Sequence, residues 1–122
     1  MNNTIKINKI DSLIEEEVFF SVNDLEIVGF NVSPQELEVG KVYEAEIDIF
    51  MIDFLEMQNQ EGTQDKKVKH INNFTYNLCG KLLDENTLDV GFYITSELFE
   101  DYQYLVGGYV SLTVDRLQVY CD

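Results

Sequence analysis

The chain has few of the residues that form reactive sites or disulfide bonds. Among its 122 residues there are no tryptophans, one proline, one histidine and two cysteines. Cys79 and Cys121 are too few for a disulfide framework, and they do not form a C-x-x-C pair. We therefore expect both thiols to be reduced and the fold to depend on its hydrophobic core.

The signatures of common catalytic and cofactor sites are also missing. His70 has no second histidine or cysteine cluster with which to bind zinc, and no G-x-S-x-G segment supplies a serine nucleophile. Neither a G-x-x-x-x-G-K-[ST] nor a G-x-G-x-x-G phosphate loop occurs. The sequence predicts a protein that is not an enzyme, with no catalytic residues, no metal and no cofactor.

Basic residues are scarce, because only 8 lysines and arginines stand against 23 aspartates and glutamates, giving a formal net charge of -15. A charge of this size repels phosphate backbones and anionic membranes and attracts basic partners. Solubility requires a net charge of only about 2 to 8 in a small domain. The excess favours a role in binding a basic protein and disfavours nucleic acid and membrane partners. The sequence does not indicate the oligomeric state.

The length and the termini predict one cytoplasmic domain. A chain of 122 residues fits a single domain, in which residues 1–32 form an N-terminal strand region. Hydrophobic residues make up 45%, which is ordinary for a globular fold. No apolar run approaches the length that spans a membrane, and the first ten residues lack the apolar core of a signal peptide.

The longest alternating run, residues 39–53, predicts the strand around which the chain is organised. One row of this strand is apolar and consists of Tyr43, Ala45, Ile47, Ile49 and Met51. The opposite row begins with Glu44, Glu46 and Asp48, which we expect to face solvent. It continues with Phe50 and Ile52, so we expect this end of the strand to be covered on both sides.

Shorter elements precede the long strand. Residues 4–10 alternate weakly and predict an edge strand or an ordered lead-in, and residues 11–17 predict either one helical turn or a solvated acidic turn. Residues 18–27 predict either a tight hairpin around Asn23 and Asp24 or one bulged strand.

After the long strand, residues 56–73 have no sustained apolar period and predict a long mobile loop. Residues 74–82 and 88–94 alternate cleanly and predict a hairpin. Ser96 or Thr95 is placed to cap one short α-helix near residues 96–106.

The end of the chain predicts a helix stop and a strand pair. Gly107 and Gly108 end the helix, because glycine adopts the left-handed closing conformation without steric cost. Residues 109–120 predict two strands. Their apolar row changes parity across Asp115 and Arg116, which indicates a bulge or a tight turn there.

The predicted fold class is mainly β, either a barrel or a sandwich, with one short helix. The order of its elements resembles the OB-fold, a five-stranded Greek-key barrel with a helix between its third and fourth strands. The segments that carry this resemblance are residues 40–53, 74–82, 88–94, 96–106 and 109–120. The resemblance implies a binding face for oligonucleotide or oligosaccharide on the second and third strands, where Tyr93 could offer a stacking ring.

In size and charge alone, the chain also resembles small acidic bacterial immunity proteins. This resemblance implies an inhibitor of a basic toxin or nuclease, and it is our leading hypothesis. Aromatic anchors inside an acidic rim are typical of protein interfaces. The expected partner-binding residues are Glu44, Glu46, Asp48, Tyr43, Tyr93, Tyr102 and Tyr104. An OB-type ligand-binding domain and a structural domain of a larger assembly remain the alternatives.

Overall fold

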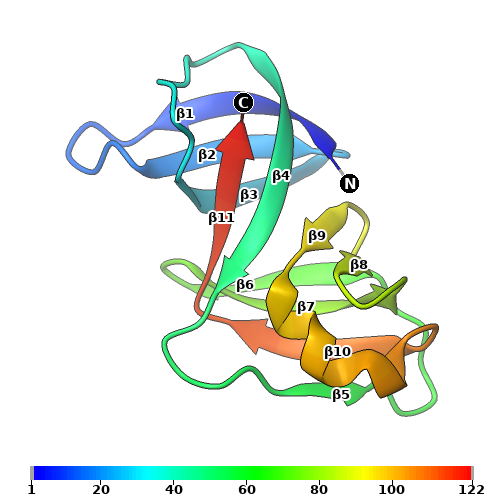
Figure 1. The fold of residues 1–122 in the computed structure, drawn as a ribbon. Coiled ribbons are helices and arrows are strands. Elements are labelled where there is room, and N and C mark those ends of the chain that lie inside the picture. Colours follow the sequence, from blue (N-terminus) through cyan, green and yellow to red (C-terminus); the bar gives the residue numbers. More distant parts are fainter. Residues whose placement is uncertain (1, 122) are drawn as a thin grey trace.

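The computed structural model describes residues 2–121 as a mainly β protein with one short helical segment (Figure 1). In chain order the strands are β1 (Asn3–Ile10), β2 (Glu17–Val22), β3 (Leu25–Asn31), β4 (Val42–Phe50), β5 (Met57–Asn59), β6 (Lys67–Asn72), β7 (Thr75–Leu82), β8 (Thr87–Asp89), β9 (Tyr93–Thr95), β10 (Tyr109–Val114) and β11 (Arg116–Cys121), with the helix η1 (Glu97–Leu105) between β9 and β10. The predicted fold class is confirmed. Within residues 2–121, no helix has the length and hydrophobicity needed to cross a membrane.

Five strands close into a barrel in the order β1-β2-β3-β11-β4, in the upper half of Figure 1. β1, β2 and β3 are consecutive and antiparallel, and β4 returns to lie beside β1, which is a Greek-key arrangement. β11 completes the barrel, antiparallel to β4 and parallel to β3. The prediction of an edge strand at residues 4–10 is wrong, since β1 has a partner on each side.

The remaining strands form a second sheet in the order β5-β10-β7-β8-β9, and β6 also pairs with β7. The segments 74–82 and 88–94 therefore lie outside the barrel in which the sequence placed them. The N-terminal strands, which the OB-like comparison left out, supply three of the barrel strands instead. The second sheet is inserted in the chain between β4 and β11.

The prediction of one long loop over residues 56–73 is wrong, because this segment contains β5 and β6. The side chains of β6 are exposed at every position except the half-buried Val68. Its backbone pairs with β7 on one side, whereas most of its side chains lie in solvent. A strand of this kind has no apolar alternation in its sequence, so periodicity could not reveal it.

Residues 88–94 form two short strands and not the single predicted strand. Gly91, with φ +108°, reverses the chain so that β8 and β9 pair with each other. The predicted inward row is nevertheless fully buried along its length: Leu88, Val90, Phe92 and Ile94. Gly80 on β7 permits the close approach of β8, since a Cβ there would lie 2.2 Å from the carbonyl oxygen of Asp89.

The long strand is confirmed as β4, with Ala45, Ile47 and Ile49 buried on its inner row. The expectation that its far end is covered on both sides is wrong. Phe50 is 38% exposed and Ile52 is 77% exposed, because the strand ends at Phe50 and the chain leaves the barrel there.

Two turns form as one of the alternatives that the sequence predicted for each. Asn23 and Asp24 have φ values of 46° and 66°, so β2 and β3 form the tight hairpin with a two-residue turn. Residues 11–17 form the acidic turn and not a helical one, with the Asp11 carboxylate accepting hydrogen bonds from the N–H groups of Leu13 and Ile14, each at 2.8 Å.

The helix is found within the predicted range, but it is a 3-10 helix interrupted by the non-helical Tyr102. Ser96 is its N-cap, as one of the two predicted alternatives stated, and Gly107 follows its end with φ +89°. Cys79 and Cys121 are both free and buried.

The chain bends at Asp115 and passes from β10 in the second sheet to β11 in the barrel (Figure 1). Val114 and Leu117, on the two sides of this bend, are both fully buried and belong to one hydrophobic core. The change of parity in the sequence therefore marks a crossing between sheets that share a core.

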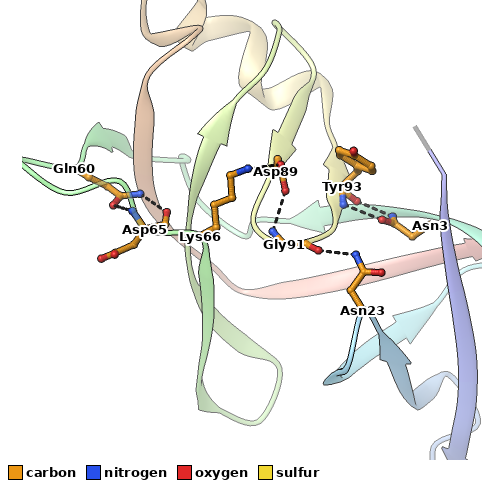
Figure 2. A network of polar contacts seen from close by, with 8 residues as sticks. All are labelled: Asn3, Asn23, Gln60, Asp65, Lys66, Asp89, Gly91 and Tyr93. Atoms are coloured by element: carbon orange, nitrogen blue, oxygen red, sulfur yellow. Dashed lines mark hydrogen bonds and ion pairs between the residues drawn. The ribbon is translucent and has the colours of Figure 1, made fainter.

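Side-chain amides of the barrel bind the backbone of the second sheet (Figure 2). The Asn3 amide bonds both backbone groups of Tyr93, and Asn23 Nδ2 donates to the Gly91 carbonyl oxygen at 2.6 Å. Within the second sheet, Lys66 Nζ lies 2.7 Å from the Asp89 carboxylate. These contacts hold β8 and β9 against the N-terminal end of the barrel.

Candidate functional site

Four carboxylates from two distant segments surround one surface hollow of about 560 Å³. Glu46 and Asp48 come from the outer row of β4, and Glu97 and Glu100 come from the first turns of η1. We call this set of four residues, with the space between them, the acidic hollow. The structure thus joins two of the predicted strand residues with acidic residues about fifty positions later in the chain.

Ser96 lines the acidic hollow and begins the helical wall of it. Its side-chain oxygen accepts a hydrogen bond from the Leu98 N–H at 3.1 Å, which starts η1 and places Glu97 and Glu100 near the positive end of the helix. The Ser96 hydroxyl also lowers the pKa of the Asp48 carboxylate. Ser96 is only 4% exposed, so it acts on Asp48 away from bulk water.

The surroundings of Asp48 in the acidic hollow disfavour the ionised form of its carboxylate. Burial raises the pKa of Asp48, and the neighbouring charges of Glu46 and Glu97 raise it further. Hydrogen bonds from the Ile49 N–H, at 2.6 Å, and from Ser96 oppose this rise in the pKa only partly. A cation placed in the hollow would relieve the repulsion between these carboxylates.

Within the described residues 2–121, no cationic side chain pairs with these four carboxylates. The ion pairs among residues 2–121 join Lys41 to Glu38, Lys66 to Asp89 and Lys67 to Asp65, and none involves the four carboxylates. In the same part of the chain, no group of three or more His, Cys, Asp or Glu side chains is arranged to hold a metal ion.

The other predicted contact residues are dispersed. Glu44 lies on the same row of β4 and accepts a hydrogen bond from the Thr4 hydroxyl at 2.6 Å. The Tyr43 hydroxyl is half-buried and accepts a hydrogen bond from the Glu38 N–H at 2.9 Å. Tyr93 is also half-buried, at the contact with Asn3.

The helix carries the two remaining tyrosines. Tyr102 donates to the Leu55 carbonyl oxygen at 2.5 Å, so its hydroxyl is used within the fold. Tyr104 is 77% exposed, and its ring centroid is 6.1 Å from that of Tyr102. Tyr120, which the sequence did not single out, is 43% exposed and pairs with Glu46 across β11 and β4. It therefore stands on the same face as the acidic hollow.

A second, less polar cleft of about 360 Å³ lies between the barrel and the second sheet. Phe19 of β2 and Val28 of β3 form one side, and Tyr76 and His70 of the second sheet form the other. The His70 and Tyr76 rings are stacked with centroids 4.9 Å apart. Lys9 Nζ lies 5.3 Å from the Phe19 ring centroid. We call this space the aromatic cleft.

The sequence of residues 1–121 matches the model of one protein family. The chain belongs to the family of uncharacterised conserved proteins UCP019853. No curated protein and no solved structure matches it. In this member of the UCP019853 family, the acidic hollow and the aromatic cleft are the two candidate binding sites.

Proposed function

We propose that this protein is a non-enzymatic binding module that captures a basic protein through the acidic hollow. The observation that carries the proposal is the convergence of Glu46, Asp48, Glu97 and Glu100 around one space without a neutralising cation among residues 2–121. An immunity-type inhibitor of a basic toxin or nuclease is the finer form of this proposal, and the size and net charge of the chain support it.

The physical basis is electrostatic. A lysine or arginine side chain entering the hollow would lower the free energy of a carboxylate whose pKa is raised by burial and by like charges. A volume of about 560 Å³ is ample for such a side chain. The long-range field of a chain with a net charge of -15 would speed the encounter, and salt would slow it.

The test uses two variants with the same change in charge. In the first, Glu46→Gln, Asp48→Asn and Glu97→Gln remove three charges from the acidic hollow. In the second, Asp53→Asn, Glu56→Gln and Glu61→Gln remove three charges from exposed positions elsewhere. The probe is a short lysine- and arginine-rich peptide, titrated at low and at physiological salt, followed by the purified product of the adjacent gene if that product is basic.

We expect the hollow variant to bind the peptide at least about tenfold more weakly, which corresponds to about 1.4 kcal/mol. The control variant should lose only the part of its peptide affinity that depends on net charge. Equal losses in the two variants would mean that the peptide responds to net charge alone, and the proposed site would be rejected.

The aromatic cleft favours a second candidate, an OB-type domain that binds an oligonucleotide or an oligosaccharide. The barrel is a five-stranded Greek key, and the cleft lies on its β2 and β3 strands, the face that OB-folds use for these ligands. Salt separates the candidates, because screening weakens capture of a basic protein and relieves the repulsion of an oligonucleotide. Labelled single strands and glycans should bind wild type and lose affinity with Phe19→Ala if this candidate is correct.

A further inference from the structure

Arg116, the only arginine in the chain, is held between two phenylalanine rings. Its guanidinium carbon lies 4.1 Å from the ring centroid of Phe30 and 4.3 Å from that of Phe50. Phe30 is itself packed edge-on against Phe74, with centroids 5.9 Å apart. Each ring attracts the cation through its π-face, so the two contacts together restrain the guanidinium.

Three barrel strands create this arrangement. Arg116 begins β11 and pairs with Phe50 at the end of β4, so their side chains lie on the same face of the barrel. Phe30 comes from β3, which lies on the other side of β11. Arg116 is half-buried and Phe50 is 38% exposed, so the stack stands at the surface.

The guanidinium has no anionic partner among residues 2–121, although the chain contains 23 acidic residues. No ion pair or hydrogen bond among residues 2–121 includes the Arg116 side chain, and its buried Nε has no acceptor there. The carboxylate of the adjacent Asp115 accepts a hydrogen bond from the Ile52 N–H at 2.7 Å. Asp48, on the same outer row as Phe50, accepts a hydrogen bond from the Ile49 N–H at 2.6 Å.

Phe30 and Phe50 reach the guanidinium from the strands on the two sides of β11, and a guanidinium donates hydrogen bonds only within its own plane. Its two Nη nitrogens form a planar fork of donors, and this fork matches the two oxygens of a carboxylate or phosphate group. Ordering such a side chain normally costs conformational entropy when a ligand binds. Here the two rings have already ordered it.

We propose that Arg116 is an oxyanion-binding site, which receives a carboxylate or a phosphate group in the plane of its guanidinium. This proposal does not depend on the acidic hollow, because it concerns the opposite sign of charge and different side chains. The net charge of -15 opposes anions at long range, so the site selects a single oxyanion group over a polyanion.

The test uses the fact that a single arginine gives a single Nε–H signal in a proton–nitrogen NMR correlation spectrum. The labelled protein is titrated separately with acetate and with inorganic phosphate, while chloride keeps the ionic strength constant near about 0.15 M. We expect a saturable shift of the Arg116 signal in at least one titration. Tighter binding of acetate assigns the site to carboxylates, and tighter binding of phosphate assigns it to phosphate groups.

Two variants complete the test, with backbone amide signals as the readout and thermal unfolding as the check on folding. Arg116→Lys keeps the charge and removes the fork, so binding should weaken about tenfold. Phe30→Leu keeps the arginine and removes one ring, so binding should weaken about fivefold. The proposal is overturned if the Nε–H signal moves no more with acetate or phosphate than with chloride, or if Arg116→Lys binds as tightly as wild type.

Discussion

The side chain of Asn3 and the backbone of Tyr93 form a pair of hydrogen bonds between residues 90 positions apart. Asn3 Nδ2 donates to the Tyr93 carbonyl oxygen at 2.8 Å, and Asn3 Oδ1 accepts from the Tyr93 N–H at 2.8 Å. Asn3 is only 6% exposed. This amide therefore links β1 of the barrel to β9, which ends the strand order of the second sheet (Figure 2).

Replacing this amide should destabilise the protein. Asn3→Asp keeps one acceptor, but it leaves the Tyr93 carbonyl without its donor and adds a poorly solvated charge, so we expect a loss of about 2 kcal/mol in the free energy of unfolding. Urea denaturation measures this loss. Asn8→Asp, which disturbs the exposed hydrogen bond to Ser21, is the matched control and should cost less than about 0.5 kcal/mol. Equal losses in the free energy of unfolding would show that the buried Asn3 contact contributes no more to stability than the exposed Asn8 contact.

The hydroxyl of Tyr76 should stabilise β3 at Val28, a residue outside the short β3–β11 pairing. It accepts a hydrogen bond from the Val28 N–H at 3.0 Å, and Tyr76 is only 2% exposed. Tyr76→Phe keeps the ring and leaves this buried N–H without an acceptor, so we expect a loss of about 1 to 3 kcal/mol. Tyr104→Phe, at a side chain that is 77% exposed, should leave stability unchanged. Chemical denaturation of both variants compares them, and a stable Tyr76→Phe would refute the assignment.

Gly80 should tolerate no side chain. A Cβ at this position would lie 2.2 Å from the carbonyl oxygen of Asp89, so Gly80→Ala must push β8 away from β7, at a cost of about 3 kcal/mol. Gly62→Ala provides the comparison. Its Cβ would meet nothing within 4 Å, and its φ of +75° alone should cost about 1 kcal/mol. Thermal unfolding of the two variants should therefore rank Gly80→Ala as clearly less stable.

Stability should depend on pH through Asp48. Its folded-state pKa is raised, mainly by burial, so its ionisation is less favourable in the folded chain than in the unfolded chain. The resulting penalty is absent below the ordinary value of 3.8 and develops as pH rises through the folded-state pKa. Asp48→Asn should therefore be more stable than wild type at neutral pH, and the difference should vanish in acid.

Urea unfolding of Asp48→Asn across this pH range measures the effect. Glu44→Gln removes one charge from the exposed end of the same strand row and controls for net charge. If the two variants have the same pH dependence, the environment of Asp48 is not its cause.

Features that depend on neighbouring residues could be predicted from the sequence. The alternation along β4 fixed which row is buried, because successive side chains of a strand must point to opposite faces. Asn23 and Asp24 predicted a tight turn, and Ser96 predicted a helix start, since both depend on local backbone geometry.

Other features needed contacts between distant residues. Gly91 gives no sequence signal for a reversal, since glycine adopts positive and negative φ equally well, so β8 and β9 looked like one strand. β6 could not be recognised because its side chains remain in water. The barrel closes with β11 between β3 and β4, a pairing of segments from the two ends of the chain that no local pattern encodes.

The sequence by itself determined the composition of the candidate site: a strand row with Glu46 and Asp48, a capped helix that begins with acidic residues, and too few cations to neutralise them. Only the tertiary structure decided that Glu97 and Glu100 meet this row and that Arg116 meets two phenylalanine rings and, among residues 2–121, no carboxylate. The reason is physical. Charge and periodicity are properties of neighbouring residues, whereas the position of a carboxylate opposite another depends on how two sheets share one core.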